Sequence, residues 1–299
     1  MLHLQERLIG TLEHALMKKI LLFAACVYLS AGFAQTDSKY PPHKLSHEDS
    51  TKVDEYWVKA NHVRLGSELR QLYLDSALAI MPWNAYFWQQ KAMPLSKAMK
   101  HELAAPYLDS AVKYDPGRWL EYRGFINCIF SKQYRAALED FYGATVLNGN
   151  SGVMDHPYYF YEALCHLQLN HVDSARYLLQ KCIEERTAKL GADWTHYLHW
   201  FYLGITWYEE ENKANAIECF DQALKLNPTF PDALFYKAQC LWQMGDKRTA
   251  LDMMYTTDSL VQKGYSMNED NNRYETYPYQ MRPYALQYAT KWLKKELEE

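Results

Sequence analysis

The sequence predicts an all-α fold in which pairs of helices repeat along the chain. Residues 197–230 and 231–264 carry small and large apolar residues at matching places of a 34-residue frame. Such a period is typical of stacked helical hairpins, because a single hairpin cannot bury its apolar face alone. Prolines recur where the predicted second helices end, at Pro82, Pro116 and Pro228. Proline stops a helix there because it lacks an N–H and clashes with the preceding turn.

Composition allows a large core and limits the class of partner. The chain has 299 residues, of which 48% are hydrophobic and 15% aromatic. Most aromatic side chains at helical spacing pack in a core, and the remainder can line a binding surface. The formal net charge is −4 and no Lys/Arg-rich run is present, so the sequence indicates no nucleic-acid partner.

The N-terminus has the three parts of an export signal. Lys18 and Lys19 form a short positive region, residues 20–29 are mostly apolar, and residues 32–34 (Gly-Phe-Ala) form a small-x-small site. This order predicts a secretory signal peptide and an exported bacterial protein of the periplasm or cell envelope. The apolar run is shorter than the roughly 20 residues of a transmembrane helix, so no membrane span is expected.

The signal sets the expected start of the mature chain. We expect cleavage before Gln35, which removes residues 1–34, and we expect Met17 to be the natural start, with residues 1–16 an upstream extension. The alternative is an amphipathic N-terminal helix in a cytosolic adaptor. A lipid anchor at Cys26 is disfavoured, because only six residues separate it from the second lysine of the positive region.

Residues 197–230 carry the most specific pattern in the chain. The predicted first helix reads W-x2-L-G-x2-W, and the second reads A-x3-F followed by Pro. The matching residues are Trp200, Leu203, Gly204, Trp207, Ala216, Phe220, Ala223 and Pro228. This stretch resembles the tetratricopeptide repeat, whose signature has Tyr at the place of the second Trp. The resemblance implies a right-handed α-solenoid of helix-turn-helix units that binds other proteins.

The same frame extends in both directions, so that the array covers residues 51–264. After a degenerate first unit, we predict five repeats at 85–118, 118–151, 156–189, 197–230 and 231–264. Their packing positions also include Trp88, Ala92, Ala111, Ala238 and Ala250. Gly124 is one residue out of frame with Ala137, which predicts an insertion or a π-bulge in that first helix. Residues 190–196 are extra, and they predict a lengthened second helix that ends near Gly191.

The array is flanked by segments of a different kind. Residues 35–50 have the composition of a flexible linker. Residues 265–299 predict a loop followed by a C-terminal capping helix that begins near Pro283. A solenoid needs such a cap to cover its last apolar face. We expect five apolar side chains of this helix to pack on the last repeat, namely Tyr284, Leu286, Tyr288, Trp292 and Leu293.

In tetratricopeptide proteins the first helix of each unit faces a concave groove that binds partners, and the resemblance carries this role to matching positions here. The candidate residues are Tyr86, Gln89, Met93, Phe160, Leu164, Phe201, Ile205, Tyr208, Phe235, Gln239 and Trp242. Their aromatic content would suit an extended or helical peptide. The alternative is that the C-terminal segment fills the groove, with Tyr274, Tyr277, Pro278 and Tyr279 lying in it.

No catalytic motif is present in the sequence. It holds no H-E-x-x-H, no G-x-S-x-G and no glycine-rich phosphate loop. His196 and His199 are three apart on one predicted helix, but the sequence places no third metal ligand beside them. The sequence therefore predicts no cofactor and no metal. The mature chain's cysteines form no C-x-x-C pair and are expected to be buried thiols, namely Cys128, Cys165, Cys182, Cys219 and Cys240.

These observations predict a non-catalytic adaptor that binds a protein or peptide partner on the concave face. A second hypothesis is a carbohydrate-handling or hydrolytic envelope protein, in which the groove aromatics stack on sugars. That activity needs a pair of carboxylates at the groove, and Asp232 and Glu209 are the candidates in this sequence.

Overall fold

A computed structural model of the chain describes residues 45–269 and 271–298. The chain divides into two compact units, residues 1–56 and 57–299, and the first described helix runs across their boundary. The predicted signal peptide and its cleavage site lie outside the described residues. The linker prediction is wrong at its end, because helix α2 already begins at His47. The Ser46 hydroxyl accepts the Asp49 amide at 3.0 Å and so caps that helix.

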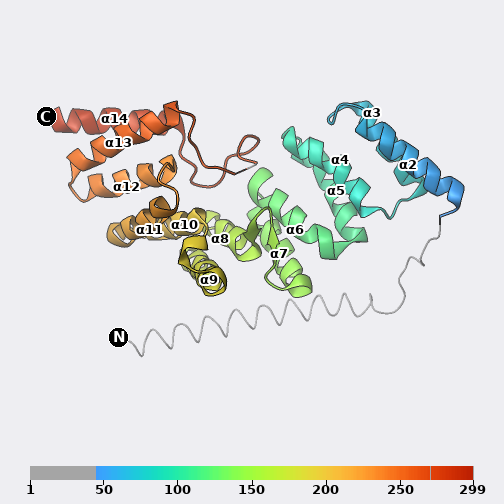
Figure 1. Cartoon of the computed structure of the whole chain (residues 1–299), viewed down its shortest axis with the longest axis horizontal. Helices are drawn as coiled ribbons and strands as arrows, with labels where there is room; N and C mark the ends of the chain where they lie inside the picture. The colour runs from blue at the N-terminus through green and yellow to red at the C-terminus, as the bar shows by residue number, and fades with distance from the viewer. Residues whose placement is uncertain (1–44, 270, 299) are drawn as a thin grey trace. The chain divides into compact units, whose positions relative to one another are not determined.

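Helices make up nearly all regular structure of the described residues, which confirms the all-α prediction (Figure 1). The α-helices are α2 (His47–Asn61), α3 (Glu68–Ile80), α4 (Ala85–Lys97), α5 (His101–Tyr114), α6 (Pro116–Phe125), α7 (Tyr134–Asn148), α8 (Tyr158–Gln168), α9 (Val172–Leu190), α10 (Tyr197–Glu209), α11 (Lys213–Leu226), α12 (Pro231–Gln243), α13 (Lys247–Gln262) and α14 (Pro283–Glu298). Shorter elements are the π-helix η1 (Ile126–Phe130), the 3₁₀-helix η2 (Ala192–Trp194), and the antiparallel pair β1 (Gly152–Val153) and β2 (His156–Pro157). Within the described residues, every helix is too short or too polar to span a bilayer.

Consecutive helices of residues 57–299 pack in pairs, as the repeat frame predicts. The pairs are α4 with α5, α6 with α7, α8 with α9, α10 with α11, and α12 with α13. The second helix of each pair also packs on the helix that follows it. Short polar side chains start several of these helices by accepting a backbone amide, namely Asn84, Asp115, Asn212 and Asp246.

The signature residues hold the paired helices close together. A Cβ added at Gly204 would lie 2.6 Å from Cε1 of Phe220, so α10 and α11 can approach this closely only with glycine there. The alanines of the frame are fully buried at Ala92, Ala111, Ala216, Ala223, Ala238 and Ala250. Leu203 and Phe220 are also buried, whereas Trp88 and Trp200 are half-buried. Pro228 is exposed just beyond the end of α11.

The prediction of an insertion or a π-bulge near Gly124 is confirmed. Helix α6 continues into the π-helix η1, whose wider turns absorb one additional residue. Gly124 still faces Phe141, and a Cβ added at this glycine would lie 3.1 Å from Cε1 of that ring. The extra residue is therefore taken up in η1, after the close contact and before the turn into α7.

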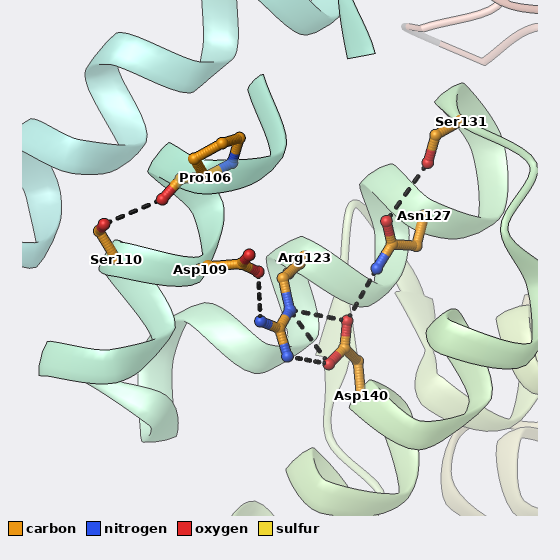
Figure 2. Close-up of polar contacts among 7 residues, drawn as sticks. All are labelled: Pro106, Asp109, Ser110, Arg123, Asn127, Ser131 and Asp140. Carbon is orange, nitrogen blue, oxygen red and sulfur yellow. Dashed lines mark hydrogen bonds and ion pairs between the residues drawn. The ribbon is translucent and has the colours of Figure 1, made fainter. Parts of the chain in front are cut away.

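An ion-pair network joins the helices around η1 (Figure 2). The Arg123 guanidinium donates to both carboxylate oxygens of the buried Asp140, at 2.6–3.2 Å, and to Asp109 of α5 at 2.8 Å. Asn127 of η1 donates to the same Asp140 carboxylate at 3.0 Å. Burial raises the pKa of Asp140, and its pair with Arg123 opposes that shift. The buried Asp140 carboxylate thus links α6, η1 and α7, and the Arg123 guanidinium adds α5 through Asp109.

Two predictions about helix ends have opposite outcomes. Helix α9 is extended to Leu190 and stops at Gly191, whose φ of +94° suits glycine, as expected. In α14 only Leu286 and Leu293 are buried, so the predicted packing of the other three residues is wrong. Tyr284, Tyr288 and Trp292 recur every fourth residue on the opposite, exposed face of that helix.

The cysteine prediction is confirmed for the described residues. Cys128, Cys165, Cys182, Cys219 and Cys240 are all buried free thiols. Burial raises the pKa of Cys219 to about 12 and that of Cys240 to about 11. These thiols therefore stay protonated and act as small apolar residues.

Candidate functional site

The predicted partner-binding face is mostly closed to solvent. Six of its residues are buried, namely Gln89, Phe160, Leu164, Phe201, Ile205 and Phe235. Four are half-buried, namely Met93, Tyr208, Gln239 and Trp242. Tyr86 alone among the eleven is exposed, with 36% of its surface accessible. The partner-binding role of these eleven residues stays a prediction, and in this structure a partner has no access to the six buried ones.

Several candidate residues are engaged with other parts of the chain. The Tyr208 hydroxyl donates to Oε1 of Gln239 at 2.7 Å, so two candidates bind each other across α10 and α12. The Trp242 indole N–H donates to Glu296 of the capping helix at 3.0 Å. The Phe160 ring stacks on His156, with ring centroids 4.1 Å apart. These partners fill positions that the sequence pattern assigned to a ligand.

Further cover comes from residues 267–269 and 271–282, which we call the docked segment. Met267 is fully buried and Tyr277 is 3% exposed. Both belong to the same buried cluster as Phe160 and Phe201. The alternative that the C-terminal segment fills the groove is thus confirmed. The segment leaves α13, passes beside the helices in the middle of the array, and returns to α14 (Figure 1).

Helix and turn side chains bind the main chain of the docked segment. The Tyr202 hydroxyl of α10 donates to the Pro278 carbonyl at 2.8 Å. The Lys132 ammonium, in the turn after η1, donates to the Thr276 carbonyl at 2.6 Å. The Asp232 carboxylate of α12 accepts the Met281 amide at 2.6 Å. Main-chain bonds of this kind give affinity to a bound peptide, while side-chain pockets give specificity.

Side chains of the docked segment reach both ends of this face. The Lys97 ammonium lies 5.2 Å from the centroid of the Tyr274 ring, and the His101 imidazole is 3.1 Å from the Glu275 carboxylate. Further along, Tyr279 packs at 6.3 Å from Tyr236 and hydrogen-bonds Glu209. The contacts extend from α4 and α5 to α12.

The two carboxylates proposed for a hydrolytic site are both engaged with this segment. Burial raises the pKa of Asp232 to about 7, and the Met281 amide opposes that shift. The Tyr279 hydroxyl hydrogen-bonds the Glu209 carboxylate. Burial is the main cause of the raised pKa of Tyr279, and this hydrogen bond raises it further. Each acid thus has a structural role in holding the segment.

The structure also gathers a histidine cluster that sequence reasoning missed. His156 of β2 lies beside His196 and His199 at the start of α10, and Glu269 of the docked segment faces them. Burial lowers the pKa of His196 to about 3 and that of His199 well below its usual value, with neighbouring His156 adding to both shifts. The sequence signal was the His196 and His199 pair, whose partners come from distant segments.

A second unusual group is the buried carboxyl of Glu162 in α8. Its side chain is 3% exposed, and Oε1 has no hydrogen-bond partner among the described residues. Burial raises its pKa to about 8. A carboxyl in this setting is protonated over much of the neutral range.

Comparisons with known proteins agree with this geometry. A family profile described as a tetratricopeptide repeat matches residues 200–230, and a second with the same description matches residues 219–252. No curated protein matches the chain significantly.

Solved structures share the fold at low sequence identity. One is PilW, described as a widely conserved type IV pilus biogenesis factor, with a TM-score of 0.56 and 12% identity over 75% of this chain and 97% of PilW. Another is Pseudomonas aeruginosa pilF, with a TM-score of 0.52 and 17% identity over 72% of this chain and 94% of pilF. MamA from Desulfovibrio magneticus RS-1, starting at its residue 41, has a TM-score of 0.50 and 16% identity over 61% of this chain and 97% of MamA.

Proposed function

We propose that this chain, which matches tetratricopeptide-repeat profiles over residues 200–230 and 219–252, is a non-catalytic adaptor whose partner presents an extended peptide to the first-helix face. The observation that carries this proposal is the docked segment. The face already binds residues 274–281 of its own chain through two main-chain carbonyls and one amide. A surface that holds a peptide in this way has the chemistry to hold another.

The docked segment indicates what such a partner peptide would look like. Its centre reads Tyr-Pro-Tyr at residues 277–279, flanked by Glu275 and Met281. Tyr277 is buried among aromatic rings, Pro278 supplies a carbonyl acceptor, and Tyr279 contacts both a tyrosine ring and a carboxylate. We expect a partner peptide with an aromatic-proline-aromatic core and an acidic residue on its N-terminal side, opposite His101.

The docked segment is covalently tethered to the face that it covers, and this determines the affinity that a competing partner needs. The segment is linked at both ends, to α13 and α14, so its effective concentration is in the millimolar range typical of short linkers. A partner with micromolar affinity at micromolar concentration cannot compete with it. Partner binding therefore requires either a much tighter peptide or a step that releases the segment first, and the adaptor is closed in the absence of its partner.

The direct test removes part of the docked segment from the chain and then adds the same sequence as a free peptide. In the variant, residues 274–279 become a Gly/Ser linker of equal length, which leaves α14 attached to α13. A fluorescent peptide of residues 271–282 is then titrated against this variant and the wild type. We expect saturable binding to the linker variant with micromolar Kd and no binding to the wild type. Far-ultraviolet circular dichroism checks that the variant keeps its helices.

Matched controls distinguish specific binding of the peptide to the first-helix face from non-specific binding. The linker variant that also carries Tyr202→Phe should bind the peptide about fivefold more weakly, because the donor to the Pro278 carbonyl is gone. A peptide with Tyr277→Ala and Tyr279→Ala should bind more weakly to a similar degree. If the folded linker variant binds none of these peptides, the face is only a structural interface and the proposal fails.

We further propose that the protein acts in the cell envelope after export. The support is the signal-like sequence of residues 17–34, which contains a positive region, an apolar run and a small-x-small site. Intact-mass analysis of protein from its native cells tests this. An N-terminus at Gln35 supports export, whereas one at Met1 or Met17 contradicts it and favours the cytosolic adaptor.

A further inference from the structure

The histidine cluster sits where the docked segment meets the array. His156 lies on β2, immediately before α8, and His196 is the residue that caps the start of α10. Glu269 comes from the docked segment, 73 residues after His196. The ligand atoms of these three residues all lie within 4.8 Å of one another. Three separate parts of the chain thus converge on one small volume.

We propose that His156, His196 and Glu269 form a binding site for a late first-row divalent metal ion, with Zn²⁺ as the best fit. Two imidazoles and a carboxylate are a donor set that zinc takes in proteins, leaving a fourth position open. Imidazole donors also disfavour Ca²⁺ and Mg²⁺, which prefer oxygen ligands. The site is independent of the partner proposed above, since it concerns only how this chain holds its own segment.

The geometry is close to that of a loaded site. Around a zinc ion with bonds of about 2.0–2.2 Å, tetrahedral ligand atoms lie roughly 3.3 Å apart. Nε2 of His156 and the Glu269 carboxylate are already 3.4 Å apart. Because the ligand atoms all lie within 4.8 Å of one another, no pair has to approach by more than about 1.5 Å when the ion binds.

A neighbouring histidine positions the His156 ring. Nδ1 of His156 is 3.5 Å from Nε2 of His199, so His156 can donate through Nδ1 while its Nε2 binds the metal. Metal-bound histidines generally use their second nitrogen in this way. His199 is 3% exposed and its Nδ1 has no hydrogen-bond partner among the described residues. Burial holds the His199 ring in place, so its Nε2 limits rotation of the His156 ring.

His196 has to adjust when the ion binds. Its Nδ1 accepts the Leu198 amide at 3.3 Å, which leaves Nε2 as the nitrogen available to a metal. Ligation through Nε2 moves the ring proton to Nδ1 and gives up that long hydrogen bond. The lost bond is a weak one, and the helix keeps its remaining backbone bonds, so this adjustment is compatible with metal binding.

A bound ion at this site would attach the docked segment to the array. Glu269 is the ligand that belongs to the segment, whereas His156 and His196 belong to the array. A bound ion therefore ties the segment to α8 and α10 near its N-terminal end. Anything that removes the ion loosens the segment at that end.

The test uses the mature chain, stripped of metal with a chelator, and zinc chloride alone as the probe. Isothermal titration should show one Zn²⁺ per chain with a Kd of micromolar or tighter. Glu269→Gln should weaken binding at least tenfold, and it conserves the shape of the side chain. Hydrogen exchange should show that Zn²⁺ slows exchange of residues 267–269 in the wild type and not in Glu269→Gln.

A second histidine pair provides the control. His166 and His171 have their Nδ1 atoms 3.3 Å apart near the surface and could bind zinc on their own. His171→Ala should leave the tight site unchanged. If His171→Ala abolishes tight binding while Glu269→Gln does not, or if the wild type binds no Zn²⁺ at micromolar concentrations, the proposal is overturned. Tetrahedral absorption of bound Co²⁺, lost in Glu269→Gln, would support it independently.

Discussion

Two repeats of this protein reach the same close helix contact by different routes. In α10 and α11, Gly204 packs against Phe220, sixteen residues later. In α6 and α7, Gly124 packs against Phe141, seventeen residues later, and the π-helix η1 takes up the difference. The contact is thus kept while the helix between its two members changes its hydrogen-bond pattern.

The residues beside these contacts differ in chemistry. Arg123 lies directly before Gly124, and Asp140 lies directly before Phe141. The two form the ion pair of Figure 2, in which the carboxylate is buried and the guanidinium is half-buried. The corresponding residues of the regular repeat are Leu203 and Cys219, both buried and apolar. The repeat pattern therefore fixes where small and large groups go, and it leaves open whether the space next to them is filled by an ion pair or by apolar side chains.

Breaking the ion pair should give the largest effect. Arg123→Leu leaves the buried Asp140 carboxylate with Asn127 as its remaining donor, and we expect the free energy of unfolding to fall by about 3–5 kcal/mol. The double variant Arg123→Leu/Asp140→Cys, which copies the regular repeat, should recover more than 1 kcal/mol of this loss. Urea denaturation measures both. Equal destabilisation of the single and double variants would mean that the pair is not what stabilises this repeat.

A second buried acid, Glu162 of α8, extends this contrast. Glu162→Gln should raise the free energy of unfolding by about 1–3 kcal/mol at pH 9 and change it little at pH 5, because one carboxylate oxygen of Glu162 has no hydrogen-bond partner among the described residues. Its pKa is raised to about 8 in the folded protein. Wild-type stability from this group is therefore complete below the ordinary pKa of 4.5 and is lost as pH rises towards 8.

The pH dependence of this effect is measured by urea denaturation of wild type and Glu162→Gln at several pH values. The exposed residue Glu184 supplies a matched control, and Glu184→Gln should show no such pH dependence. A wild type that gains stability between pH 5 and 8 relative to Glu162→Gln would contradict the assignment.

Alanine in place of the two glycines should separate a contact with no room for a methyl group from a tight contact that a shift of a few tenths of an ångström relieves. At Gly204 the added methyl would lie 2.6 Å from the Phe220 ring, and overpacking of about 1–3 kcal/mol exceeds the gain of about 1 kcal/mol in helix propensity. We expect a net loss of about 1–2 kcal/mol. At Gly124 the nearest atom is 3.1 Å away, so Gly124→Ala should be close to neutral. Thermal and urea unfolding of both variants provide the comparison, and a costlier Gly124→Ala would refute it.

The smallest effects on stability are expected where side chains of a repeat hydrogen-bond the docked segment. Lys132→Met, beside η1, and Tyr202→Phe, in α10, each remove one hydrogen bond to a carbonyl of that segment. We expect local opening to become easier by about 1 kcal/mol in each case, with global stability nearly unchanged. Hydrogen exchange of residues 274–281 measures this. Unchanged exchange in both variants would show that aromatic burial alone holds the segment.

Much of the fold could be predicted because the information is local and periodic. The 34-residue frame located the helix pairs from α4 to α13, and the one-residue offset between Gly124 and Ala137 located η1. Helix and turn chemistry act over a few residues, so a pattern of spacings is sufficient to find them. The same reasoning was wrong for α14, where it assigned Tyr284, Tyr288 and Trp292 to the packed face.

The sequence by itself determined the repeat architecture and the buried cysteines. Only the tertiary structure decided that this face is covered, and that Glu269 meets His156 and His196. The reason is that the docked segment follows no period and contacts residues of the array that lie 43–177 positions earlier in the chain. Such contacts depend on the folded array as a whole, which no local spacing of residue types encodes.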